Sequence, residues 1–100
     1  MDNIQFKDQV RIWNDFPIKG IKFKDINPLL LTADSLSYLD EKLSHMCVNV
    51  QLNKIAAIES RGFIPGSLLA KSLNKGLVLI RKEGKLPGPT IKQSYSIEYG

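Results

Sequence analysis

The sequence has 100 residues, of which 43% are hydrophobic and 24% charged, and its formal net charge is +4. These values indicate one globular domain or part of one, which buries roughly 65% of its unfolded surface, and they exclude a disordered chain. No apolar stretch approaches the roughly 18 residues of a membrane helix, and a single cysteine excludes an internal disulfide. Without a basic segment and apolar run at the N-terminus, the sequence predicts a soluble cytoplasmic protein.

The N-terminal segment predicts a helix, a turn and a short strand. Asp2 or Asn3 can cap the helix, which should end before Pro17 because proline restricts the residue that precedes it. The apolar residues of one helix face are Phe6, Val10 and Trp13. Residues 17–20 predict a turn, and residues 21–24 alternate between apolar and polar side chains, as in a half-buried strand.

A second helix is predicted after residue 31. Thr32 or Asp34 can cap it. Its apolar residues keep a helical spacing over about four turns: Leu36, Leu39, Leu43, Met46 and Val50. His45 and Cys47 lie in this segment without a second metal ligand or a base nearby, so neither is assigned a function.

The middle of the chain predicts a strand–helix–strand unit. Two short apolar runs, Lys54–Ile58 and Leu77–Ile80, are typical of strands covered on both faces. A helix over residues 63–73, ended by a turn at residues 74–76, would join them as a right-handed parallel crossover. Ligands of such sheets bind beyond the carboxyl ends of the strands.

Polar and basic residues follow both predicted strands at this edge. Glu59-Ser60-Arg61-Gly62 follows the first strand and Arg81-Lys82 the second. A Ser-Arg-Gly turn before a helix offers a hydroxyl, backbone N–H groups and a fixed cation, all of which attract anions. On this pattern alone, a capped helix with a surface arginine is the commoner explanation.

The segment from Arg81 to Thr90 has two Gly, two Pro and no apolar periodicity, which predicts a loop. Four basic residues and one acid lie between Arg81 and Lys92, a net charge of +3. A single-stranded nucleic-acid-binding strip would interleave aromatic residues with these cations, and this one contains none. From Ser94 to Tyr99 polar and apolar side chains alternate again.

Three separated motifs together resemble adenine phosphoribosyltransferases, and the resemblance extends from Asp15 to Gly100. The opening motif comprises residues 15–17, 20–26 and 28–30, the pyrophosphate turn residues 59–63, and the catalytic loop residues 80–82, 84–90 and 94–100. The resemblance implies an α/β chain with a partial type I phosphoribosyltransferase fold, in which helices flank a parallel sheet and an N-terminal hood segment is added. The chain would be a single, incomplete domain over residues 1–100, with a helix and hood at about 1–30, a βαβ core at about 31–80 and a flexible catalytic loop at about 81–100.

The activity that this resemblance implies is purine salvage. Members transfer a phosphoribosyl group from phosphoribosyl pyrophosphate to N9 of adenine and release AMP and pyrophosphate. They use Mg²⁺ together with phosphoribosyl pyrophosphate and are usually homodimers; no nucleic acid or membrane partner is expected. Because negative charge builds on the departing pyrophosphate, fixed cations placed there lower the barrier.

Site roles follow from the resemblance, position by position. Phe23 corresponds to the ring that stacks on adenine, and Lys24 to the position whose backbone reads the adenine edge. Ser60 and Arg61 correspond to pyrophosphate ligands, and members often hold the peptide bond before this serine in the cis form.

The catalytic loop would supply the remaining roles. Arg81 and Lys85 correspond to cations that meet the pyrophosphate. Glu98 corresponds to the catalytic carboxylate, and Tyr99 to a neighbour that helps to order the closed loop. No residue is assigned as a metal ligand.

The sequence departs from the family pattern in three ways. Asn27 stands where Ser or Thr is usual, and Pro65 where an aromatic residue is common. The Thr/Gly-rich loop that binds the ribose phosphate is not found in these 100 residues. The alternative to an active transferase is therefore an inactive fragment that retains weak base or pyrophosphate binding, and the chain alone is expected not to turn over.

Overall fold

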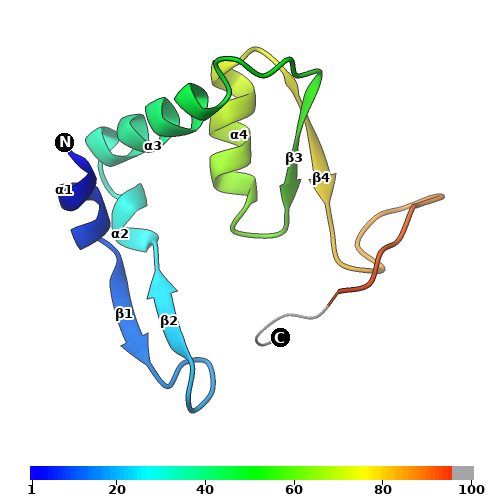
Figure 1. Ribbon diagram of the computed structural model, residues 1–100. Coiled ribbons are helices and arrows are strands. Elements are labelled where there is room, and N and C mark those ends of the chain that lie inside the picture. The colour runs from blue at the N-terminus through cyan, green and yellow to red at the C-terminus, as the bar shows by residue number, and fades with distance from the viewer. Residues whose placement is uncertain (96–100) are drawn as a thin grey trace. The chain divides into compact units, whose positions relative to one another are not determined.

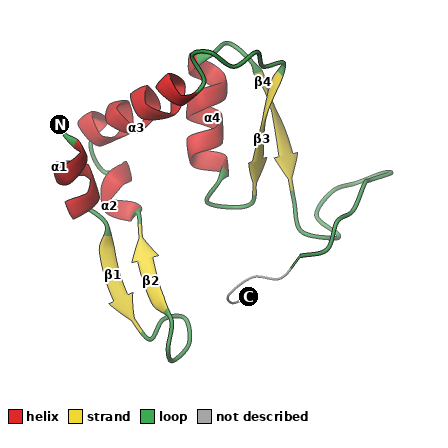
Figure 2. Cartoon of the chain, in the orientation of Figure 1, coloured by secondary structure: helices red, strands yellow, loops and turns green. Residues whose placement is uncertain are grey.

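The computed structural model describes residues 1–95 and divides into two compact units, residues 1–42 and residues from Leu43 onward. Each unit has its own two-stranded sheet. The elements, labelled in Figures 1 and 2, are α1 (Asn3–Asp8), β1 (Arg11–Asn14), β2 (Lys22–Asp25), α2 (Asn27–Leu30), α3 (Ala33–Met46), β3 (Lys54–Ile58), α4 (Phe63–Ser72) and β4 (Gly76–Ile80). None of the helices in residues 1–95 is both long and apolar enough to cross a membrane.

The first helix is shorter than predicted. Asp2 caps it as expected, in a capping box with Gln5. The prediction that Trp13 shares a helix face with Phe6 is wrong, because residues 11–14 form β1 and pair antiparallel with β2. A side-chain contact across the two strands accompanies this pairing: Trp13 Nε1 donates to Asp25 Oδ2 at 3.2 Å.

The loop between β1 and β2 confirms the turn predicted at residues 17–20, and β2 confirms the strand predicted at residues 21–24. Asp15 (φ 55°) and Gly20 (φ 90°) both have left-handed backbone conformations, and the peptide bond between Phe16 and Pro17 is cis. Asp15 Oδ1 accepts a hydrogen bond from the Gly20 N–H at 2.8 Å, which closes the loop. The hairpin presents Phe23 on β2 directly opposite Trp13 on β1.

The longest helix, α3, starts where the sequence predicts. Thr32 caps it, because its Oγ1 accepts a hydrogen bond from the Ser35 N–H at 3.2 Å. Ser35 is fully buried in the first unit, and its hydroxyl donates to Gln9 Oε1 at 2.8 Å. The predicted extension to Val50 is wrong: the helix ends at Met46, after which backbone bonds to the third preceding carbonyl tighten the chain into turns.

The strand–helix–strand unit confirms the central prediction. Strands β3 and β4 pair in parallel, with Ile55 opposite Leu77 and Ile58 opposite Ile80. Helix α4 connects them and ends at the predicted turn, where Asn74 (φ 56°) takes the left-handed conformation that often closes a helix. Figure 1 shows α4 alongside the strand pair.

Small residues let α4 lie close to β3. A Cβ atom added to Gly66 would lie 2.6 Å from the Cβ of Ala57, so only glycine fits at this distance. Under this helix face, Ile55 and Ala57 are buried.

The expectation that both strands are covered on both faces is wrong for the described residues. Ala56 and Ile58 of β3 are exposed, and every residue of β4 is exposed. The physical reason is that α4 packs on this strand pair, and one helix covers a single face.

Candidate functional site

The carboxyl ends of β3 and β4 meet at one edge of the sheet, as the parallel pairing requires. The ladder continues one residue past β3, because the Glu59 N–H donates to the Ile80 carbonyl at 2.9 Å. The turn after β3 and the loop after β4 therefore start side by side, and Figure 1 shows both leaving the same end of the strand pair. The two polar segments predicted for this edge, residues 59–62 and 81–82, are thus brought together.

The turn after β3 leads directly into α4. The peptide bond between Glu59 and Ser60 is cis, in agreement with the family resemblance. Both Ser60 and Arg61 are exposed. The residue at the N-cap of α4 is Gly62, which makes no side-chain capping bond. The first N–H groups of α4 already have partners, because those of Phe63 and Ile64 donate to the Ser60 and Arg61 carbonyls at 3.2 and 3.3 Å and Pro65 has no N–H. What this end of the helix offers an anion is therefore the positive end of its dipole.

Gly62 is required by the path of this turn. A Cβ atom at this position would lie 2.4 Å from the carbonyl oxygen of Ile58. The backbone of Gly62 is right-handed (φ −63°, ψ −21°), so the missing side chain serves close packing and not an unusual dihedral angle. The turn can fold back on β3 only because this side chain is absent.

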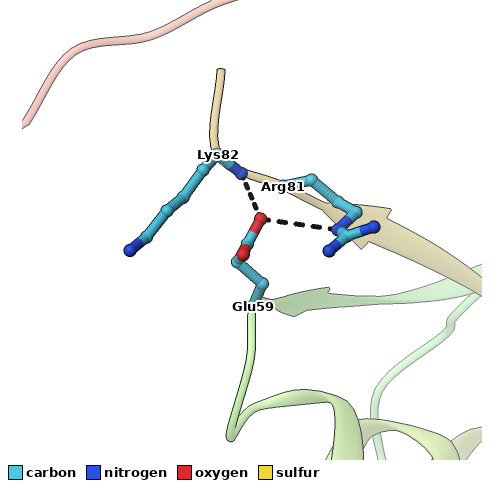
Figure 3. Close-up of polar contacts among 3 residues, drawn as sticks. All are labelled: Glu59, Arg81 and Lys82. Atoms are coloured by element: carbon cyan, nitrogen blue, oxygen red, sulfur yellow. Dashed lines mark hydrogen bonds and ion pairs between the residues drawn. The ribbon is translucent and has the colours of Figure 1, made fainter. Parts of the chain in front are cut away.

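A carboxylate ties the two segments together. Glu59 Oε1 accepts a hydrogen bond from the backbone N–H of Lys82 and lies 3.4 Å from Nε of Arg81 (Figure 3). The Arg81 guanidinium carbon also lies 5.8 Å from the centroid of the Phe63 ring, at the first residue of α4. These contacts thus connect the turn after β3, the loop after β4 and the start of α4, through Glu59, Arg81 and Phe63 respectively.

The hydrogen bond from Lys82 lowers the pKa of Glu59 below its usual value. Desolvation opposes this shift, and the positive charges of Arg81, Lys82 and Lys85 reinforce it. Sequence reasoning assigned no role to Glu59. The sequence does contain a signal for such a contact, since an acid directly follows one predicted strand and cations directly follow the neighbouring strand.

Lowering the pH should weaken the contacts that the Glu59 carboxylate makes with Lys82 and Arg81. A carboxyl whose pKa is lower in the folded than in the unfolded protein adds stability above its unfolded-state pKa and loses it as the pH falls through the folded-state pKa. We expect the stability difference between the protein and its Glu59→Gln variant to be largest near neutral pH and to shrink in acid, below the ordinary carboxyl range. Thermal unfolding of both proteins across this range measures it; a difference that stays constant with pH would contradict the assignment.

The segment after β4 has the predicted loop structure. Gly84 (φ 84°) and Gly88 (φ 75°) have left-handed conformations, and the Lys85 N–H donates to the Lys82 carbonyl at 3.1 Å in a turn. An ion pair joins Lys92 Nζ to Glu83 Oε1 at 2.9 Å, with both side chains mostly exposed. Lys85 therefore lies one turn beyond the Glu59 link.

The two residues assigned to adenine belong to the first unit. Phe23 is half-buried on β2, and the ring of Phe16 meets it edge-on with 5.1 Å between centroids. Lys24, the next residue of the strand, is exposed. The hairpin holds the Phe23 ring through its strand pairing and through Phe16.

Glu98 and Tyr99, assigned to catalysis, lie outside the described residues. Within residues 1–95, no group of three His, Cys, Asp or Glu side chains is close enough to hold a metal ion.

The chain was compared with known proteins. No family model matches it. The adenine phosphoribosyltransferase of Geotalea uraniireducens is 47% identical over 96% of this chain and 56% of its own length. That of Leptospira biflexa is 48% identical over 94% of this chain and 53% of its own length. The chain thus spans about half the length of the curated relatives it matches.

Solved structures agree with the sequence comparison. The adenine phosphoribosyltransferase of Thermoanaerobacter pseudethanolicus matches with a TM-score of 0.90 and 44% identity, over 97% of this chain and 56% of that one. The enzyme of Giardia lamblia, solved with 9-deazaadenine, matches with a TM-score of 0.94 and 38% identity, over 99% of this chain and 55% of that one. These matches confirm the predicted partial type I phosphoribosyltransferase fold. By sequence and by fold, the chain is similar to adenine phosphoribosyltransferases over about half of their length.

Proposed function

We propose that the protein transfers the phosphoribosyl group of phosphoribosyl pyrophosphate to adenine, forming AMP and pyrophosphate. The observation that carries the proposal is the sheet edge at which the turn at Ser60, the start of α4 and the cationic loop come together, in a chain 47% identical to an adenine phosphoribosyltransferase. The related enzyme of Trypanosoma brucei was solved with AMP, pyrophosphate and ribose-5-phosphate. The same chemistry at this edge would place a leaving pyrophosphate among donors and cations.

The pyrophosphate would be bound by residues of the second unit. Ser60 offers a hydroxyl and Arg61 a guanidinium on the turn, and the positive end of the α4 dipole adds to their attraction for an anion. Arg81 and Lys85 bring further positive charge from the loop. Because charge grows on the pyrophosphate in the transition state, these groups stabilise it more than the ground state and so accelerate transfer. Mg²⁺ would be bound by the phosphates of the donor substrate and would share that charge.

Adenine would be bound by the hairpin of the first unit. The Phe23 ring supplies an apolar face for stacking, and the backbone at Lys24 supplies hydrogen bonds to the edge of the base. The alternating burial along β2, with Phe23 half-buried between exposed Lys22 and Lys24, supports this division of roles.

Replacing Phe23 by Ala should raise the KM for adenine by about tenfold, because stacking of a base on an aromatic ring contributes roughly 1–3 kcal/mol. The KM for phosphoribosyl pyrophosphate should change much less. Steady-state kinetics with each substrate varied in turn measures both values. Ile12→Ala is the matched control, since Ile12 is an exposed apolar residue of the same hairpin; equal effects of the two variants on adenine use would contradict the role of Phe23.

The function is tested by AMP formation from adenine and phosphoribosyl pyrophosphate, with and without Mg²⁺, by the gene product at its full length. Magnesium-dependent turnover supports the proposal, and its absence contradicts it. Pyrophosphate binding without turnover would favour the inactive, binding-only alternative. We also propose that the active form is a homodimer of the cytoplasm; the mass of the active species in solution and its location in fractionated cells test these two points.

A further inference from the structure

We propose that Glu59 is a positioning residue for the pyrophosphate cations, fixing the start of the loop so that Arg81 faces the anion site. The inference rests on the proposed function, to which it adds a residue that touches no substrate. One carboxylate oxygen holds both the Lys82 N–H and Arg81 Nε, as Figure 3 shows. The residue that bears this carboxylate is itself fixed, because its N–H donates to the Ile80 carbonyl.

The contact leaves Arg81 able to bind an anion. A guanidinium has five N–H donors in a planar fork, and Glu59 lies against the Nε side, so the terminal amino groups remain for other partners. The Glu59 side chain is 11% exposed and that of Arg81 is 32% exposed, so the carboxylate is covered while the cation reaches solvent. The Phe63 ring restrains the same guanidinium from the helix side.

The negative charge of Glu59 does not by itself favour the binding of pyrophosphate. A carboxylate beside Arg81, Lys82 and Lys85 reduces the positive potential that would attract a pyrophosphate. If Glu59 acted only through its charge, its removal would strengthen pyrophosphate binding. If Glu59 acts by holding Arg81 and the loop, its removal weakens pyrophosphate binding. The misplaced cation then loses more binding free energy than the added positive potential supplies. The two effects have opposite signs, so one experiment separates them.

The experiment compares Glu59→Ala and Glu59→Gln with the unmodified gene product. The Ala variant loses both contacts, whereas Gln keeps an oxygen for the Lys82 N–H and loses the ion pair with Arg81. We expect kcat/KM for phosphoribosyl pyrophosphate to fall by about 100-fold in the Ala variant and by about tenfold in the Gln variant, the order of loss that a small misplacement produces. The KM for adenine should stay within about twofold of the original in both.

Glu83→Gln is the matched control, since it removes one acid of the same loop whose partner, Lys92, is mostly exposed. It should leave kcat/KM for the donor nearly unchanged. Unchanged or tighter donor use in both Glu59 variants would overturn the proposal, as would equal losses for adenine and donor, which a general structural defect produces.

A second measurement does not need turnover. In the unmodified protein, the NMR signal of the Lys82 amide should shift with the titration of Glu59, and inorganic pyrophosphate should bind less tightly to Glu59→Gln than to Glu83→Gln. If the unmodified protein makes no AMP, the proposed function fails, while this binding comparison still decides the role of Glu59. Equal or tighter pyrophosphate binding by Glu59→Gln would overturn it, even if the Ala variant does not fold.

Discussion

Replacing Gly62 by Ala should destabilise the protein by about 2–3 kcal/mol, within the range for a methyl group forced into a packed site. The added Cβ would lie 2.4 Å from the carbonyl oxygen of Ile58, and backbone cannot yield as a flexible side chain can. Alanine otherwise favours a helical backbone such as that of Gly62, so the steric effect has to exceed a propensity gain of about 1 kcal/mol. Urea unfolding with a two-state fit measures the net loss.

The same substitution should damage the site more than the fold. Relief of the contact requires the turn at Ser60 and Arg61 to move away from β3, and a displacement of about 1 Å can reduce an enzyme's rate by roughly 100-fold. We therefore expect kcat/KM for phosphoribosyl pyrophosphate to fall by about 100-fold in Gly62→Ala, at a temperature where the variant is still folded.

Two other glycines provide controls. Gly76→Ala should be nearly neutral, because its Cβ would meet only Lys54 Nζ, at 3.5 Å. Gly66→Ala should destabilise the protein through the Cβ of Ala57, and a second change, Ala57→Gly, should restore part of the loss. Gly62→Ala has no such rescue, because its obstacle is backbone. Wild-type stability and kinetics in Gly62→Ala would show that the turn has more room than the structure indicates.

Local pattern was sufficient to predict the strand–helix–strand unit. Lys54–Ile58 and Leu77–Ile80 are short apolar runs separated by one helical span, and these features arise within each segment. The first helix was overextended because Arg11–Asn14 becomes a strand through its partner, Lys22–Asp25, and a pairing of two segments leaves little trace in either alone. Apolar composition also predicted coverage of both strand faces, whereas the described residues cover one of them.

The location of the candidate site was predictable from the sequence, but one of its contacts was not. Strand order placed Ser60, Arg61 and Arg81 at one edge of the sheet, because parallel strands end on the same side. The role of Glu59 was not predictable, since it depends on which oxygen of the turn reaches the Lys82 N–H and on the side from which Arg81 approaches. Such contacts are set by the tertiary path of two segments and not by their composition.

Replacing Glu98 by Gln should lower kcat by about 100- to 1,000-fold, the contribution typical of a positioned acid or base. The assignment rests on the family resemblance, in which Glu98 is the carboxylate beside the reacting nitrogen of adenine. Glutamine keeps the size and the hydrogen-bonding oxygen of the side chain but cannot take up or hold a proton. The loss should therefore fall on the chemical step.

Donor binding should be spared in this variant, because the groups assigned to the pyrophosphate are Ser60, Arg61, Arg81 and Lys85. The KM for phosphoribosyl pyrophosphate is expected to change by less than about threefold, so kcat and kcat/KM fall together, as they do when an interaction specific to the transition state is removed. Single-turnover and steady-state assays with gene product of confirmed mass measure both values. Glu83→Gln, an acid-to-amide change in the same loop at an exposed ion pair, should retain nearly full turnover. If the two variants lose the same amount of activity, or if Glu98→Gln changes the donor KM more than kcat, the catalytic carboxylate lies elsewhere.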